Sequence, residues 1–199
     1  KKSTKKKATR KKAASARKPK LDGISDIRRF FHRNETPVFF VSATNFNLLG
    51  IDEWVGNFHY INYIDCFDHA HPSVFVPEET PHPVFESIED INNYLLSHKE
   101  VIDFIRSRGE NPKAVFLMFN EETERICKEI GLEVCFPSAK LREEVDNKIG
   151  ATRIAKRAGV PCVPNVLAKL DSFKTLRRVS KRLRRDLAPQ APFGYTGHN

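Results

Sequence analysis

The sequence predicts an α/β protein built on a Rossmann-like, doubly wound parallel sheet. Strand-like and helix-like segments alternate from residue 21 to residue 139. The inner strand candidates are continuously apolar, as strands covered on both faces must be. The helix candidates carry apolar residues every three to four positions. We therefore divide the chain into a basic tail (1–20), a Rossmann-like domain (21–139) and the start of an α+β domain (140–199).

The first half of the Rossmann-like domain contains its clearest strand, Pro-Val-Phe-Phe-Val at 37–41. A polar turn follows at 42–50, and the stretch at 68–83 predicts an irregular loop because it holds four prolines. The remaining elements expected here are a helix at 25–32, a short helix at 51–55 and a strand at 59–65.

The second half begins at Ser87, which with Asp90 forms a capping-box pattern at a helix start. The helical pattern continues through Ile105 and ends at Gly109. Asn120 is positioned to cap a further helix. Strands are expected on either side of that helix, at 113–119 and 132–136. No G-x-G-x-x-G follows the first strand, so a conventional dinucleotide site is not supported.

Positive charge is concentrated at the start of the chain. Residues 1–20 hold nine Lys, two Arg and no acid, which gives them +11; the whole chain carries +9, so the rest carries −2. The tail has too little apolar surface to fold, and we expect it to be disordered. It could bind nucleic-acid phosphates weakly and without sequence preference. A solubilising tail without a partner is an equal alternative.

Several protein classes are not indicated by the composition. No apolar run approaches the roughly 20 residues of a membrane span, and no signal-peptide pattern follows the charged start. We therefore expect a cytoplasmic protein with no membrane partner. The four cysteines lack C-x-x-C spacing, so neither disulfides nor a zinc site are indicated.

The segment 140–158 predicts a helix that Gly159 and Pro161 end. Its apolar stripe consists of Leu141, Val145, Ile149 and Ala155. Lys148 lies at the edge of this stripe, where its ammonium could reach a cleft while its stem packs on apolar neighbours. Spacing alone favours an ordinary solvated lysine.

A resemblance changes that interpretation. The stretch from Asp146 to Asn165, D-N-K-I-G-A-T-R-I-A-K-R-A-G-V-P-C-V-P-N, resembles the D-K…A-G-V-P-x-V-P segment of ATP-grasp enzymes such as biotin carboxylase and carbamoyl phosphate synthase. In that family the lysine contacts ATP phosphates, which implies this role for Lys148. The residue directly before it is Asn147, where the family has Asp.

Further elements of the ATP-grasp pattern are expected after this helix. A strand is expected at 165–169, a basic helix capped by Asp171 at 171–185, and a strand at 186–191. P-F-G-Y-T-G-H at 192–198 resembles the glycine-rich loop that folds over the triphosphate, since glycine lets the backbone approach phosphate closely. The resemblance implies nucleotide contacts by Gln190, Gly194, Thr196, Gly197 and His198. Gln190 stands where biotin carboxylases carry a second lysine.

The resemblance implies an ATP-dependent ligase. Such enzymes use ATP and Mg²⁺ to convert a carboxylate into an acyl phosphate, which a nucleophile then attacks. The family's Mg²⁺ ligands are expected beyond Asn199, so this chain by itself is expected to be inactive, and the carboxylate stays unidentified. Two alternatives remain: a nucleic-acid-associated protein that binds through its tail with the α/β domain as a scaffold, and an inert ATP-grasp relative that binds a partner protein.

Three smaller features of the sequence are candidate sites. His69, His71 and His82 could ligate zinc, but loop histidines without a supporting cysteine are more often surface polar groups. Cys66 beside His69 lacks a third group to orient a thiol nucleophile. The polar turn from Ser42 to Asn47 follows the first strand, at the edge where open α/β sheets bind ligands, and is a candidate surface for the acceptor substrate.

Overall fold

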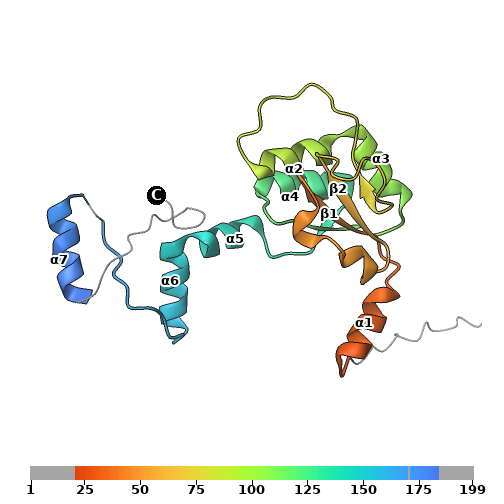
Figure 1. The fold of residues 1–199 in the computed structure, drawn as a ribbon. Coiled ribbons are helices and arrows are strands. Elements are labelled where there is room, and N and C mark those ends of the chain that lie inside the picture. The colour runs from red at the N-terminus through yellow and green to blue at the C-terminus, as the bar shows by residue number, and fades with distance from the viewer. Residues whose placement is uncertain (1–20, 170, 184–199) are drawn as a thin grey trace, which may run out of the picture.

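The computed structural model describes residues 21–169 and 171–183. It contains a five-stranded sheet in which every neighbouring pair is parallel, in the order β3-β2-β1-β4-β5 (Figure 1). This arrangement confirms the α/β class. The strands are β1 (Val38–Ser42), β2 (Phe58–Asn62), β3 (Val74–Phe75), β4 (Lys113–Val115) and β5 (Glu133–Val134).

The described helices fall into two groups along the chain. Those that end by Ile130 are α1 (Ile24–His32), the 3-10 helices η1 (Phe46–Leu48) and η2 (Ile51–Glu53), α2 (Ile88–Ser97), α3 (Lys99–Ser107) and α4 (Glu121–Ile130). Those after it are α5 (Ala139–Asp146), α6 (Lys148–Arg157) and α7 (Phe173–Leu183). No helix within the described ranges is long and apolar enough to cross a membrane.

The core lies on both faces of β1. Phe39 and Val41 point to one face, where they join a buried cluster that includes Leu95 of α2, Val101 of α3 and Ile126 of α4. Phe40 points to the other face and packs with Phe58 and Tyr60 beside η1 and η2. The alternation follows from the two-residue period of a strand. The sheet is therefore covered on both faces, as predicted, with short 3-10 turns in place of long helices on one side.

Some predicted elements have different limits. The single helix expected from Ser87 to Gly109 is two helices, because His98 adopts an extended conformation between them and its Nδ1 accepts from Glu100 N–H (3.3 Å). The capping box at Ser87 is confirmed. The strand expected at 113–119 ends at Val115, and the loop expected at 68–83 contains the short strand β3.

The region after residue 139 departs further from the predictions. The helix expected at 140–158 is broken at Asn147, and its apolar stripe is not buried: Leu141 and Val145 are each about half exposed. Residues 165–169 form no strand, since a strand needs a hydrogen-bonded neighbour and none of the described residues supplies one. At the start of α7, Ser172 Oγ accepts from Thr175 N–H (3.2 Å), so Ser172 caps this helix in place of Asp171.

Candidate functional site

The polar turn that follows β1 lies at the carboxyl edge of the sheet, as predicted. After β1 the chain continues to β2 on one side of the sheet, and after β4 it continues to β5 on the other side. The direction in which strands are added therefore reverses between the neighbours β1 and β4. Such a reversal point is where open parallel sheets usually bind ligands. Ser42 is buried at the end of β1, and Asn45 is fully buried in the turn.

Asn45 is the least satisfied polar residue of this edge. Its backbone N–H donates to the amide oxygen of Asn62 (3.2 Å) when the Asn62 amide is oriented to satisfy both its groups. Neither its side-chain oxygen nor its side-chain nitrogen has a hydrogen-bond partner among the described residues. A buried amide without a hydrogen-bond partner costs folding free energy. Such groups are usually found at functional positions or where a bound water molecule satisfies them.

A depression of about 490 Å³ lies beside the end of β4 and the start of α4. Its lining is rich in carboxylates, which come from α2, α4 and α5. The lining residues are Glu89, Met118, Phe119, Asn120, Glu121, Glu122, Ala139, Arg142, Glu143 and Asp146. Among residues 21–169 and 171–183, no three His, Cys, Asp or Glu side chains come close enough to hold a metal ion.

Arg142 of α5 connects this depression to the sheet. Its guanidinium donates to the Phe119 carbonyl (2.7 Å), lies 2.8 Å from Met118 Sδ, and pairs with Asp146 (3.1 Å) and Glu89 (3.8 Å). Its Cζ also lies 5.5 Å from the Phe119 ring centroid. These contacts link α5 to the segment that joins β4 to α4. Sequence reasoning missed this residue.

The elbow between α5 and α6 places Lys148. Asn147 breaks the helix and its Oδ1 accepts from the N–H groups of Ile149 and Gly150, both at 3.0 Å. Asn and Asp cap helices equally well, so Asn147 keeps the local geometry that Asp would give. A Cβ at Gly150 would lie 2.5 Å from the Glu144 carbonyl oxygen, so the absence of a side chain at this position allows α6 to turn tightly against α5.

Lys148 is the first residue of α6 and is partly buried. Within the described part of the chain, its ammonium takes part in no hydrogen bond or ion pair, whereas the nearby Lys156 donates to Asn165 Oδ1 (2.7 Å). An open depression of about 1240 Å³ lies along the elbow and is lined by both helices. Its charged lining residues are Lys140, Glu143, Glu144, Arg153, Lys156 and Arg157, and Lys148 is not among the residues that line it.

The other predicted nucleotide contacts, Gln190, Gly194, Thr196, Gly197 and His198, lie outside the described residues, as does the basic tail at 1–20. They stay predictions.

The histidines of the loop after β2 form separate local contacts. His69 Nδ1 pairs with Asp65 (2.9 Å), and His71 Nε2 lies 4.0 Å from Asp52. His82 stacks on Phe85 with ring centroids 4.2 Å apart and shares Glu79 with the Tyr63 hydroxyl. The Cys66 thiol lies 3.8 Å from the Ile64 carbonyl. These contacts give each of the three histidines a local carboxylate.

Comparison with known proteins gives one curated relative. Over 99 residues the chain is 28% identical to the 2-oxoglutarate carboxylase small subunit of Hydrogenobacter thermophilus. The aligned region covers 48% of this chain and 21% of that protein. The chain is similar to a carboxylase subunit. It spans about a fifth of the length of that relative. No protein-family model matches the chain, and no solved structure matches it.

Proposed function

We propose that this chain contributes the lead-in α/β domain and the first nucleotide-binding helices of a biotin carboxylase-like ATP-grasp ligase. The ligase would use ATP to activate a carboxylate as an acyl phosphate. Two features support the proposal: the similarity to a carboxylase subunit and the lysine-bearing segment that starts at Asp146. A parallel α/β sheet followed along the chain by this segment agrees with the organisation that the resemblance implies.

The observation that carries the proposal is the state of Lys148. Its side chain is partly buried at a sharp elbow, and none of the described carboxylates neutralises its ammonium. Asn147 already satisfies the N–H groups of Ile149 and Gly150, so the helix start offers little to a phosphate. The fixed positive charge of Lys148 would therefore have to provide the attraction to a triphosphate.

The described residues fit a phosphate group better than they fit Mg²⁺. A free lysine suits a phosphate oxygen, but no set of three metal-binding side chains is present within residues 21–169 and 171–183. When bound, Mg²⁺ would neutralise charge on the transferred phosphoryl group. The part of the reaction that this chain supports is thus the grip on the nucleotide. The polar turn from Ser42 to Asn47 at the carboxyl edge, which encloses the unsatisfied Asn45 amide, is our candidate surface for the acceptor carboxylate.

The test is calorimetric titration of ATP with Mg²⁺ into the full-length polypeptide that contains these residues. Lys148→Ala should weaken ATP binding about tenfold or more, because one charge-assisted contact to phosphate is lost. Lys156→Ala is the matched control: it removes a lysine from the same helix, but one whose ammonium is held by Asn165. Thermal melting should show both variants folded. Equal ATP affinity of the wild type and Lys148→Ala would refute the proposal.

A further inference from the structure

An exposed apolar surface covers α1 and the neighbouring Trp54. We call it the α1 surface. In a helix with 3.6 residues per turn, the apolar side chains of α1 gather on one side. None is buried, and Ile24 is 71% exposed. The members of the α1 surface are Leu21, Ile24, Ile27, Phe30, Phe31 and Trp54, each at least 40% exposed. Figure 1 shows α1 projecting from the body of the domain.

The attachment of α1 is tight at its carboxyl end. Gly56 N–H donates to the Phe31 carbonyl (2.9 Å), and Asn34 Nδ2 donates to the Gly56 carbonyl (2.7 Å). A Cβ at Gly56 would lie 2.6 Å from the Asn34 carbonyl oxygen, so only glycine permits this approach. The helix is therefore held at one end while its apolar side stays open to solvent.

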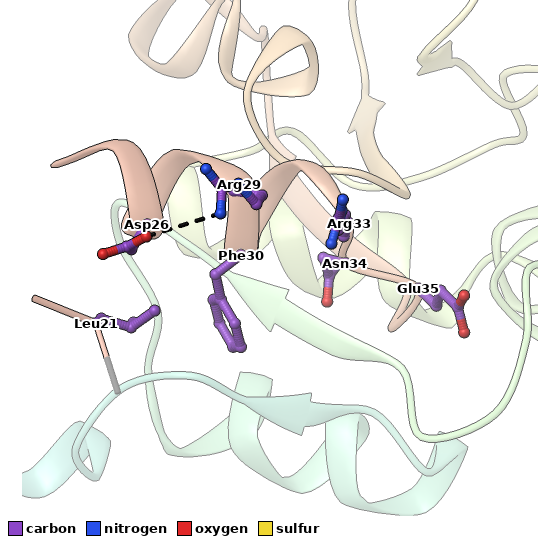
Figure 2. Close-up of a pocket in the computed structure, with 7 residues that line it drawn as sticks. All are labelled: Leu21, Asp26, Arg29, Phe30, Arg33, Asn34 and Glu35. Carbon is purple, nitrogen blue, oxygen red and sulfur yellow. Dashed lines mark ion pairs between the residues drawn. The ribbon is translucent and has the colours of Figure 1, made fainter. Parts of the chain in front are cut away.

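Arginines border the α1 surface on both sides. Arg29 and Arg33 lie beside Phe30 around a depression of about 480 Å³, where Arg29 pairs loosely with Asp26 (3.9 Å) (Figure 2). Arg28 lies on the opposite border, with its Cζ 4.5 Å from the Trp54 ring centroid. The sequence immediately before α1 adds the +11 of residues 1–20. Residues 21–35 also hold Asp22, Asp26 and Glu35, so the three arginines are matched in number by three carboxylates, and the excess positive charge lies in the sequence before α1.

We propose that the α1 surface docks on an anionic lipid surface, with α1 lying in the plane of the headgroups. A short helix of this kind inserts its apolar side while arginines at its borders reach the lipid phosphates. Trp54 suits the boundary between headgroups and acyl chains. Surface docking needs no membrane-spanning length, so it is compatible with the absence of a spanning helix among the described residues.

Charge complementarity favours lipid over the other possible occupants. A second copy of the chain would carry the same net charge of +9, so two copies would repel each other. A nucleic acid would satisfy the charges but would leave the aliphatic side chains of Leu21, Ile24 and Ile27 in water. An anionic membrane surface satisfies both features. This inference goes beyond the proposed function and does not depend on nucleotide binding.

The experiment is co-sedimentation of the full chain with vesicles. Binding is expected to vesicles that contain phosphatidylglycerol and not to pure phosphatidylcholine. Ile24→Ser and Phe30→Ser should each weaken binding about tenfold, since each removes an apolar side chain that would enter the membrane. Val84→Ser is the matched control, because Val84 is 90% exposed and lies outside the α1 surface. Circular dichroism should show that all three variants are folded.

A second set of variants tests the charges. Replacing Arg28, Arg29 and Arg33 by Gln should weaken vesicle binding on the order of a hundredfold. The same change at Lys99, Arg106 and Lys128, all exposed on other helices, should have a much smaller effect. Three outcomes would overturn the proposal: vesicle binding that ignores every α1 substitution, self-association that Ile24→Ser abolishes, or DNA binding that Ile24→Ser weakens while vesicles are not bound.

Discussion

Gly150→Ala gives a sharp test of the elbow that positions Lys148. An alanine inside an ordinary helix is more stable than glycine by about 1 kcal/mol. Here the added Cβ would lie 2.5 Å from the Glu144 backbone oxygen, much closer than van der Waals contact. That oxygen belongs to the backbone of α5, so it can move only if the helix moves. Overpacking of this kind costs about 1–3 kcal/mol. The clash should therefore outweigh the helix preference and destabilise the elbow by roughly 1 kcal/mol.

Amide hydrogen exchange followed by mass spectrometry measures this effect locally. Peptides covering 147–158 should exchange about fivefold faster in Gly150→Ala than in the wild type, because a loss of 1 kcal/mol changes an opening equilibrium by that factor. Gly23→Ala is the control, since a Cβ there meets nothing within 4 Å. Slower exchange in Gly150→Ala would show that the helix preference wins, and it would refute the tight turn between α5 and α6.

The remaining predictions concern the domain that supports the site. Burial, and then the charge of Arg108, lower the pKa of His59 to about 4. The free energy of unfolding should therefore fall by about 1–2 kcal/mol as the pH drops from 6.5 to 4. Urea titrations should show a weaker pH dependence in His59→Phe, and the same pH dependence as in the wild type would contradict this prediction. Burial and the hydrogen bond to Asp52 raise the pKa of Tyr60 to about 12. The protonated hydroxyl should therefore contribute its full share to the free energy of unfolding below pH 10, and this share should be lost between pH 10 and 12. Tyr60→Phe should abolish this loss of stability at alkaline pH and should destabilise the fold by about 1–3 kcal/mol at neutral pH, as measured by thermal unfolding. An unchanged stability at neutral pH would mean that Asp52 finds another hydrogen-bond partner. Asn120→Ala removes the cap of α4 and should cost about 1 kcal/mol in urea unfolding, with Asn120→Asp close to wild type.

Local chemistry explains which parts of the fold the sequence predicts well. The caps at Ser87 and Asn120 depend on a side chain and an N–H three residues later, so the pattern is visible in the sequence. The continuous apolar run of β1 likewise follows from its central place in the sheet. The end of a strand depends on how far the neighbouring strand supplies hydrogen-bond partners, which the sequence of the strand itself does not show. The strand expected to reach residue 119 ends at Val115, where its pairing with β1 ends.

Helix breaks were the main error, and they share one cause. At His98 and at Asn147 the apolar periodicity continues through the break, so it predicts one helix in each case. In the structure each residue adopts an extended conformation, and its side chain accepts an N–H of the following helix. The signal was the polar, cap-competent residue within each helical pattern. Sequence spacing does not show whether such a side chain will point to solvent or cap the next helix.

Part of the candidate site is predictable from the sequence and part is not. Family resemblance predicts the role of Lys148, and the structure adds that its ammonium has no hydrogen bond or ion pair among the described residues. The sequence does not predict the role of Arg142, because its partners Phe119 and Glu89 lie 23 and 53 residues away in the chain. A lone arginine in a helix gives no sign that it will reach the carbonyl of a distant loop residue.

The position of Lys148 relative to the sheet depends on two connections in series. The elbow fixes Lys148 relative to α5 through Asn147 and Gly150, and Arg142 fixes α5 relative to the end of β4. α6 itself has no buried residue that could hold it in place. A change at either connection should therefore move the lysine without unfolding the α/β domain. If nucleotide binding requires this lysine near the carboxyl edge, substitutions at Gly150 and Arg142 should weaken ATP binding while the cores on both faces of β1 stay intact.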